Sequence, residues 1–184
     1  MTPHRHSKRL RSATGAPFTL VELLTVVGIV ALLAVILLPV LGKARDRSRA
    51  AVCLNQVRQI GQALHEYAND NRDLLPVCAR LGPDTTYGLP SLRQALESTW
   101  DASAGAFRCP ADRGTPSLFE EVGTSYEWNT FVNGRTIDRA GFRVLGLEVT
   151  APLFGDAEAF HARGTRNYLY ADGHVAPSLE ILIQ

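Results

Sequence analysis

The longest apolar run of the chain lies near its start. Residues 23–42 read LLTVVGIVALLAVILLPVLG and carry no charged side chain. At about 1.5 Å per residue, a helix over this run is about 30 Å long, which matches the hydrocarbon core of a bilayer. A cleaved signal peptide has a shorter apolar core and a small-x-small cleavage site. The pattern therefore favours a retained membrane helix.

A helical stripe continues beyond this run. Apolar residues recur at spacings of three and four, with polar residues between them, at Ala50, Cys53, Val57, Ile60, Leu64 and Tyr67. No helix stop precedes Asn69-Asp70-Asn71, and Gly61 weakens the helix by about 1 kcal/mol without ending it. Pro39 is expected to bend or locally melt the apolar half. The pattern predicts one long helix, half in lipid and half carrying a globular head.

The rest of the chain is predicted to form that head. Residues 91–99 read as a short helix, and residues 101–124 read as loop because glycine and proline recur there. Short apolar or alternating segments predict strands at 124–132, 144–149 and 167–175. Ala171-Asp172-Gly173 predicts a two-residue hairpin turn in the last of them. The expected fold class is α+β, with the long helix packed on a small antiparallel sheet with irregular loops.

Composition narrows the function classes. The 184 residues carry a net charge of +1, so no overall field points to nucleic acid or anionic lipid. Nucleic acid is not an expected partner, because a few loop arginines are more typical of a solvated surface. The chain contains no Gly-x-Ser-x-Gly, phosphate-binding loop or His-Glu-x-x-His motif, and we do not expect an enzyme. Basic residues flank both ends of the apolar run, so charge alone does not orient it.

The start of the chain resembles a known family. A basic leader, Phe18-Thr19-Leu20-Val21-Glu22, and Pro39 late in the apolar helix together resemble the class III signal of type IV prepilins and type II secretion pseudopilins. In that family the prepilin peptidase cuts before the apolar segment and methylates the new N-terminus. The family usually has glycine directly before the phenylalanine, whereas Pro17 stands here and the nearest glycine is Gly15. A cut before Phe18 is favoured because it keeps the spacing to Glu22, and a cut after Gly15 is the alternative.

The resemblance gives Glu22 a role. A carboxylate and a new α-amine near the hydrocarbon boundary are each costly alone. Paired between adjacent subunits, each offsets the desolvation of the other, so the pair would set the register of assembly. The alternative is that Glu22 only reaches the cytoplasmic membrane interface.

The head extends the resemblance to most of the chain. CLNQVRQIGQALHEYANDN, FRCPAD, SYEWN and HARGTRNYLYADGHV resemble a bacterial group of prepilin-like proteins with a C-terminal signature of His, nine residues and Asp-Gly. Here ten residues separate His161 from Asp172, so either His161 is not the equivalent histidine or the loop carries an insertion. The resemblance implies a pilin-like fold with a cleaved leader (1–17), an assembly helix (18–42), its amphipathic continuation (43–70) and an extracytoplasmic head (71–184).

The implied function is that of a structural subunit of a type IV pilus or type II secretion pseudopilus-like filament. Its expected partners are like subunits and minor pilins, the prepilin peptidase, the inner-membrane assembly machinery and the lipid bilayer. The expected location is the bacterial inner membrane, with the N-terminus in the cytoplasm and the head outside. The alternative is an unassembled single-span envelope protein whose head binds calcium, a glycan or an envelope polymer.

The head also contains candidate metal ligands. Because major pseudopilins bind calcium in a C-terminal loop, the resemblance makes Asp156 and Asp172 candidate calcium ligands. Zinc is less favoured, since His161 and His174 lack tight ligand spacing and no cysteine lies close to them in sequence. The simpler interpretation is that Asp172-Gly173 forms the hairpin turn and the histidines hydrogen-bond to loops.

Three cysteines leave one unpaired. Cys78 and Cys109 are the expected disulfide, because both lie in predicted loops of an extracytoplasmic head. Their bond would close a loop of about thirty residues and contribute about 3–4 kcal/mol. Cys53 reads as a small buried apolar residue on the helical stripe, and pairing of Cys53 with Cys109 stays open.

Overall fold

The computed structural model describes residues 19–101, 103–144, 147–161 and 164–179. Gly15, Pro17 and Phe18, at which cleavage is expected, lie outside the described residues. The chain divides into two compact units, Met1–Gly42 and Lys43–Gln184.

One helix, α1 (Leu20–Asp70), contributes to both units. It ends within the Asn69-Asp70-Asn71 segment at which the sequence places the helix stop. The helix continues through Pro39, so the local melting expected there is not observed. The proline ring removes only the hydrogen bond that an amide N–H would make to the carbonyl of Val35.

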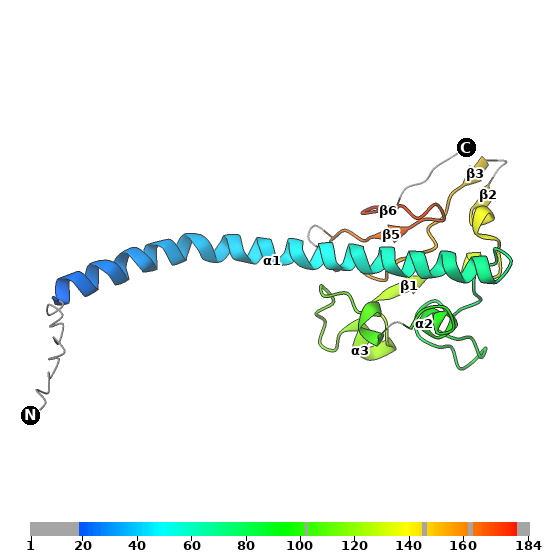
Figure 1. Ribbon diagram of the computed structural model, residues 1–184, viewed down its shortest axis with the longest axis horizontal. Helices are drawn as coiled ribbons and strands as arrows, with labels where there is room; N and C mark the ends of the chain where they lie inside the picture. The colour runs from blue at the N-terminus through cyan, green and yellow to red at the C-terminus, as the bar shows by residue number, and fades with distance from the viewer. Residues whose placement is uncertain (1–18, 102, 145–146, 162–163, 180–184) are drawn as a thin grey trace, which may run out of the picture. The chain divides into compact units, whose positions relative to one another are not determined.

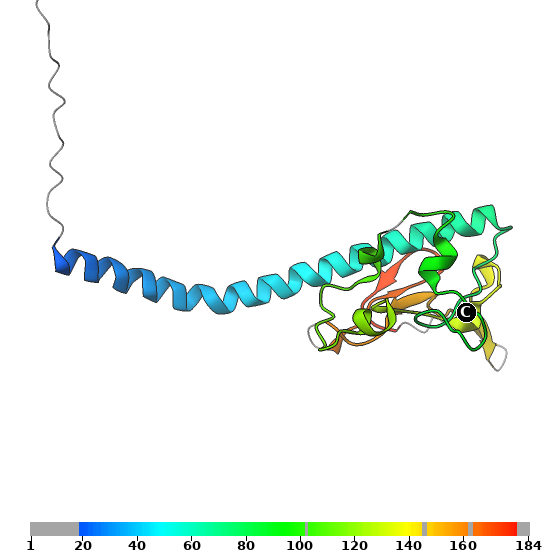
Figure 2. The same ribbon diagram turned by 90° about the horizontal axis from the view of Figure 1, so that it is seen from below.

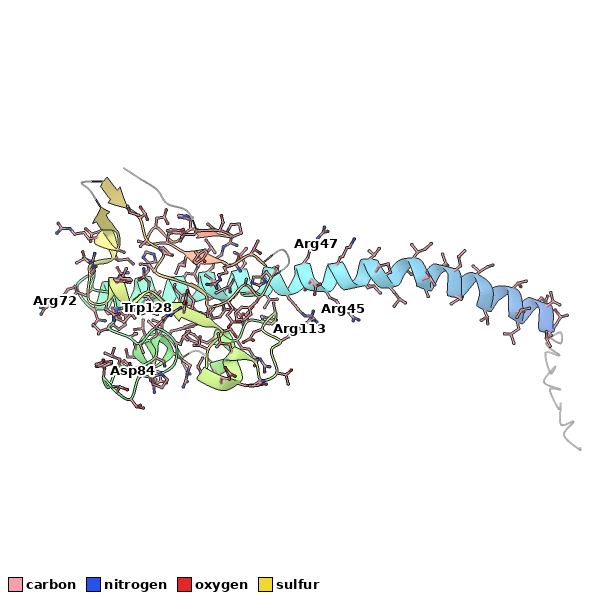
Figure 3. All side chains as sticks on the ribbon, turned by 180° about the vertical axis from the view of Figure 1, so that it is seen from behind. Arg45, Arg47, Arg72, Asp84, Arg113 and Trp128 are labelled. Carbon is pink, nitrogen blue, oxygen red and sulfur yellow. The ribbon has the colours of Figure 1, made fainter. Side chains whose placement is uncertain are left out.

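The first half of α1 buries none of its side chains. Every leucine, valine and isoleucine from Leu20 to Leu41 is 48–80% exposed, and these side chains radiate on all sides of the helix (Figure 3). Burying one such side chain is worth about 1.5–3 kcal/mol, so this segment is strongly unfavourable in water. By length and composition, α1 can cross a membrane once.

The second half of α1 packs into the head, as its stripe predicts. Cys53, Val57, Ile60 and Leu64 are fully buried in the core. Gly61 faces β5 so closely that a Cβ there would lie 2.8 Å from Cδ1 of Leu169. The glycine that weakens the helix therefore lets the helix approach the sheet.

The sheet of the head has four short antiparallel strands in the order β1-β4-β5-β6. They are β1 (Tyr126–Trp128), β4 (Phe154–Asp156), β5 (Tyr168–Leu169) and β6 (Val175–Ala176). Figures 1 and 2 show the second half of α1 running alongside these strands. A separate antiparallel pair consists of β2 (Phe142–Val144) and β3 (Leu147–Val149). The α+β layout with one long helix and a small antiparallel sheet is confirmed.

Short helices complete the head. The predicted helix at 91–99 forms as α2 (Leu92–Leu96), which begins with a capping box between Ser91 and Gln94. A second helix, α3 (Leu118–Val122), lies in the segment predicted to be loop. Its sequence signal is local: Ser117 and Glu120 form another capping box, and Gly123 ends the helix at φ 82°. Three short 3₁₀ helices are η1 (Ala104–Phe107), η2 (Thr130–Val132) and η3 (Ile137–Arg139).

Three strand predictions need correction. The segment 124–132 holds only β1 and then turns into η2. The segment 144–149 is not one strand but contains the end of β2 and the whole of β3, and β4 was not predicted. The hairpin between β5 and β6 forms as predicted, but its turn has three residues, Ala171-Asp172-Gly173. The backbone N–H of Tyr170 donates to the carbonyl of His174 at 3.0 Å, and Gly173 adopts φ 84°. This is the three-residue turn in which glycine takes the left-handed position.

Gly155 in β4 generates a prediction about packing. A Cβ at this position would lie 2.6 Å from the carbonyl oxygen of Asn167, a backbone atom that cannot rotate away. We expect Gly155→Ala to lower the free energy of unfolding by about 1–3 kcal/mol, measured by urea denaturation. The control is Gly105→Ala, whose Cβ would meet its nearest atom at 3.7 Å. Equal stability of the two variants would contradict the prediction.

Candidate functional site

The start of α1 is closed by a reciprocal pair of side chains. The backbone N–H and the hydroxyl of Thr19 donate to Oε2 of Glu22 at 2.9 and 2.8 Å. In return, the backbone N–H of Glu22 donates to the Thr19 hydroxyl at 3.2 Å. This is a capping box, and its Thr-x-x-Glu signal is visible in the sequence. Glu22 therefore caps its own helix, a role beyond the two predicted for it, pairing with a neighbouring subunit and reaching the membrane interface.

The head contains a second, buried constellation. The buried cluster consists of Cys53, Cys109, Asp156 and His161, whose ligand atoms all lie within 4.8 Å of one another. Cys53 comes from α1, Cys109 follows η1, Asp156 ends β4, and His161 lies in the loop after β4. The cluster therefore joins the helix, the sheet and two loops of the head, and it could hold a metal ion.

Asp156 is the hub of the cluster. Its side chain is fully buried, so its carboxylate needs compensating partners. Cys53 Sγ donates to Oδ1 at 3.1 Å. The backbone N–H and the side-chain amide of Asn167 donate to Oδ2 at 2.6 and 2.9 Å, and Nε2 of His161 lies 3.1 Å from the same oxygen. Asn167 belongs to no motif that would have marked it in the sequence.

The cluster changes the acidity of its members. The hydrogen bond between His161 and Asp156 raises the pKa of His161 to about 9. The neighbouring Cys53 thiol, with a smaller contribution from His161, lowers the pKa of Cys109 to about 6. The same contact with Cys109, together with burial, raises the pKa of the Cys53 thiol. Cys109 is therefore the more acidic of the two thiols, which is the electrostatic setting of a metal-binding cysteine.

The candidate calcium ligands separate in the structure. Asp156 lies in the cluster, whereas Asp172 is exposed and accepts the backbone N–H of His174 within the hairpin turn. Asp172-Gly173 therefore forms part of the hairpin turn, as the simpler interpretation predicts. Two thiols, one imidazole and one carboxylate also differ from the six to eight oxygen ligands that calcium prefers. Calcium is not the metal that this donor set fits.

The expected Cys78–Cys109 disulfide is not formed. All three cysteines, each within the described residues, are free and buried. Cys109 follows η1 and lies beside Cys53 and His161. Cys78 instead contacts the side chain of Asn133 through its backbone. The backbone N–H of Cys78 donates to Oδ1 of Asn133 at 3.1 Å, and Nδ2 of Asn133 donates to the backbone carbonyl of Cys78 at 3.0 Å. Burial raises the pKa of the Cys78 thiol to about 12, so this thiol is chemically inert.

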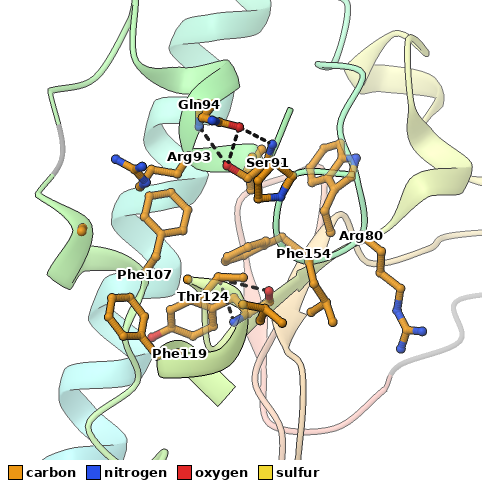
Figure 4. Close-up of a pocket in the computed structure, with 16 residues that line it drawn as sticks. Arg80, Ser91, Arg93, Gln94, Phe107, Phe119, Thr124 and Phe154 are labelled. Carbon is orange, nitrogen blue, oxygen red and sulfur yellow. Dashed lines mark hydrogen bonds between the residues drawn. The ribbon is translucent and has the colours of Figure 1, made fainter. Parts of the chain in front are cut away.

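A small cavity lies between α2, α3 and the sheet. Its volume is about 170 Å³, and Phe107, Phe119 and Phe154 contribute much of its wall (Figure 4). Pockets for small-molecule ligands usually measure about 300–1,000 Å³. The hydroxyl of Thr124 at its edge is already bonded to the backbone of Tyr126. This cavity is therefore a gap in aromatic packing and not the main candidate site.

No known protein family, curated protein or solved structure matches the chain. Two features carry its functional interpretation. One is the exposed apolar helix that begins at the Thr19–Glu22 capping box. The other is the buried cluster in the head.

The side chain of Asn167 provides a test of the cluster as a polar network. Asn167→Ala should remove the Nδ2 bond to Asp156 and leave a buried carboxylate short of one donor. We expect a loss of about 1–3 kcal/mol in the free energy of unfolding, measured by urea denaturation. In the control, Asn71→Ala removes a bond of similar length, 2.8 Å to the Tyr67 carbonyl, at an exposed position. A loss in Asn167→Ala no larger than in the control would show that the carboxylate does not depend on this donor.

Proposed function

We propose that the protein is a prepilin-like structural subunit of a type IV pilus or type II secretion pseudopilus-like filament. The observation that supports this most is the composition of α1. Its first half exposes every large apolar side chain, while its second half belongs to the core of a folded head. A bilayer would cover the first half before assembly, and the equivalent helices of neighbouring subunits would cover it afterwards.

The rest of the proposal follows from the resemblance of the leader. The chain is inserted in the bacterial inner membrane with its N-terminus in the cytoplasm and its head outside. The prepilin peptidase removes the leader and methylates the new N-terminus, and the assembly machinery adds the subunit to like subunits and minor pilins. In this proposal the protein is a substrate and a building block and not a catalyst.

The capping box is compatible with a role of Glu22 in assembly. Both bonds from Thr19 go to Oε2 of Glu22. The other oxygen, Oε1, makes no hydrogen bond among the described residues, so it can accept the α-amine of a neighbouring subunit. In an apolar environment such a pair offsets the cost of desolvating both charges. Glu22 would thus start its own helix and position the next one.

Processing provides the first test of the proposal. We expect the mature chain, analysed by mass spectrometry of membrane-purified protein, to begin at Phe18 with a methylated amine. Pro17→Gly should keep or increase the processed fraction, because it restores the glycine usual in the family. Gly15→Ala should leave processing unchanged if the cut precedes Phe18 and abolish it if the cut follows Gly15. A dominant species that retains Met1 would favour the alternative, a plain single-span envelope protein.

Assembly provides the second test. Glu22→Gln keeps an N3 residue that can complete a capping box but removes the charge. We expect normal insertion and a fall of about tenfold or more in the filament fraction, because the neighbouring amine loses its counter-charge. The matched variant Thr19→Ala breaks the capping box, keeps the carboxylate, and should still assemble. The measurement is an immunoblot of sheared filaments from cells without a wild-type copy. Normal assembly of Glu22→Gln would restrict Glu22 to helix capping.

A further inference from the structure

We propose that the buried cluster is a zinc site that fastens the second half of α1 to the sheet and loops of the head. This inference concerns the head alone and does not depend on filament assembly. The four donors come from different parts of the sequence, and Cys53 and Asp156 are 103 positions apart. Only the fold brings them together, which is why their spacing carries no motif.

The donor types favour zinc among the common divalent cations. Zinc binds thiolate, imidazole and carboxylate ligands, and its structural sites are four-coordinate. Magnesium and calcium prefer oxygen ligands, and Asp156 is the one residue of the cluster that offers them. Thiolates select zinc and other thiophilic metals over these hard cations.

The spacing of the donors also fits a tetrahedral site. With metal–ligand bonds of about 2.0–2.3 Å, neighbouring ligand atoms of a tetrahedron lie about 3.3–3.8 Å apart. Cys53 Sγ and Asp156 Oδ1 are 3.1 Å apart, and His161 Nε2 and Asp156 Oδ2 are also 3.1 Å apart. Cys109 Sγ lies 3.9 Å from His161 Nε2. The four ligand atoms, one from each residue, all lie within 4.8 Å of one another, so side-chain shifts of at most about 1 Å would bring them to the corners of such a tetrahedron.

His161 and Asn167 crowd one oxygen of Asp156. Nε2 of His161 lies 3.1 Å from Oδ2, and the side-chain amide of Asn167 donates to the same oxygen at 2.9 Å. The two nitrogens are only 3.0 Å apart, so without a metal ion two N–H donors share a single carboxylate oxygen. A metal ion bound to the Nε2 lone pair and to Asp156 would take the place of the proton between them.

The surroundings of the cluster suit ligand positioning. Asn167 donates to Asp156 from both its backbone and its side chain, and such outer contacts orient ligating carboxylates. Nδ1 of His161 is buried and has no hydrogen-bond partner among the described residues. The outer hydrogen bond that usually orients a ligating histidine is therefore absent among the described residues, and the ring is held from the cluster side.

The rival for the same atoms is a disulfide between Cys53 and Cys109. It would need a two-electron oxidation of the pair and would remove two of the four zinc ligands. The two states are mutually exclusive, so a single preparation of protein can distinguish them.

The experiment uses the full chain purified in detergent micelles without added reductant or chelator. Elemental analysis should find about one zinc per chain in the wild type. Removing the metal with a chelator should lower the thermal midpoint by about 10 °C, and added Zn²⁺ should restore it while Ca²⁺ does not. Substitution by Co²⁺ should produce the ligand-field absorption of a tetrahedral site and a thiolate-to-metal charge-transfer band.

Variants identify the ligands. Cys109→Ser should lower the zinc content at least about tenfold, whereas Cys78→Ser, at a buried cysteine outside the cluster, should keep it. Because Cys109→Ser can also impair folding, the Co²⁺ spectrum of the wild type tests the thiolate ligands without any substitution. Three results would each overturn the proposal: a Cys53–Cys109 disulfide in the peptide map of the unreduced wild type, no binding of titrated Zn²⁺, or a Co²⁺ spectrum without a thiolate band.

Discussion

The packing of the second half of α1 against the sheet is the constraint on which the head depends. Strands of two or three residues are too short to form a stable sheet by themselves. Here two strands of the sheet contact the helix: Leu169 of β5 sits against Gly61, and the hydroxyl of Tyr126 in β1 donates to Gln56 at 2.9 Å. The four fully buried residues of the stripe fill the same core. Without the helix, the sheet would lose one wall of that core, and the edge strand β1 would lose its hydrogen bond to Gln56.

The two halves of α1 therefore have separate roles: the second half packs into the head, and the first half takes no part in that packing. The first fully buried residue of the helix is Cys53, and all residues from Leu20 to Arg47 are exposed. Folding of the head therefore uses no side chain that a bilayer or a neighbouring subunit would need. A subunit of the proposed kind must exchange lipid for protein around its apolar helix while its head stays folded. The division of residues along α1 permits that exchange.

The sequence predicted the parts of the fold that local patterns determine. The stripe from Ala50 to Tyr67, the capped helix α2 and the β5–β6 hairpin all follow from periodicity or turn residues. α3 also had a local signal, the Ser117-x-x-Glu120 capping box, which glycines and prolines nearby obscured. β4 is three residues with a central glycine, and only its position between β1 and β5 defines it. The cluster was invisible for the same reason: Asp156 and Asp172 both neighbour a glycine in sequence, and only burial distinguishes the ligand from the turn residue.

Packing alone does not account for the residue types in the cluster. An alanine or valine would satisfy the helical stripe at position 53 as well as a cysteine does, but it could not donate to Asp156. A fully buried carboxylate at the end of a central strand costs several kcal/mol unless it is compensated, and any apolar residue there would avoid that cost. His161 adds a buried ring whose Nδ1 has no hydrogen-bond partner among the described residues. Each residue is unfavourable as a filler of the core, whereas the zinc site that we propose would use all three as ligands of one cation.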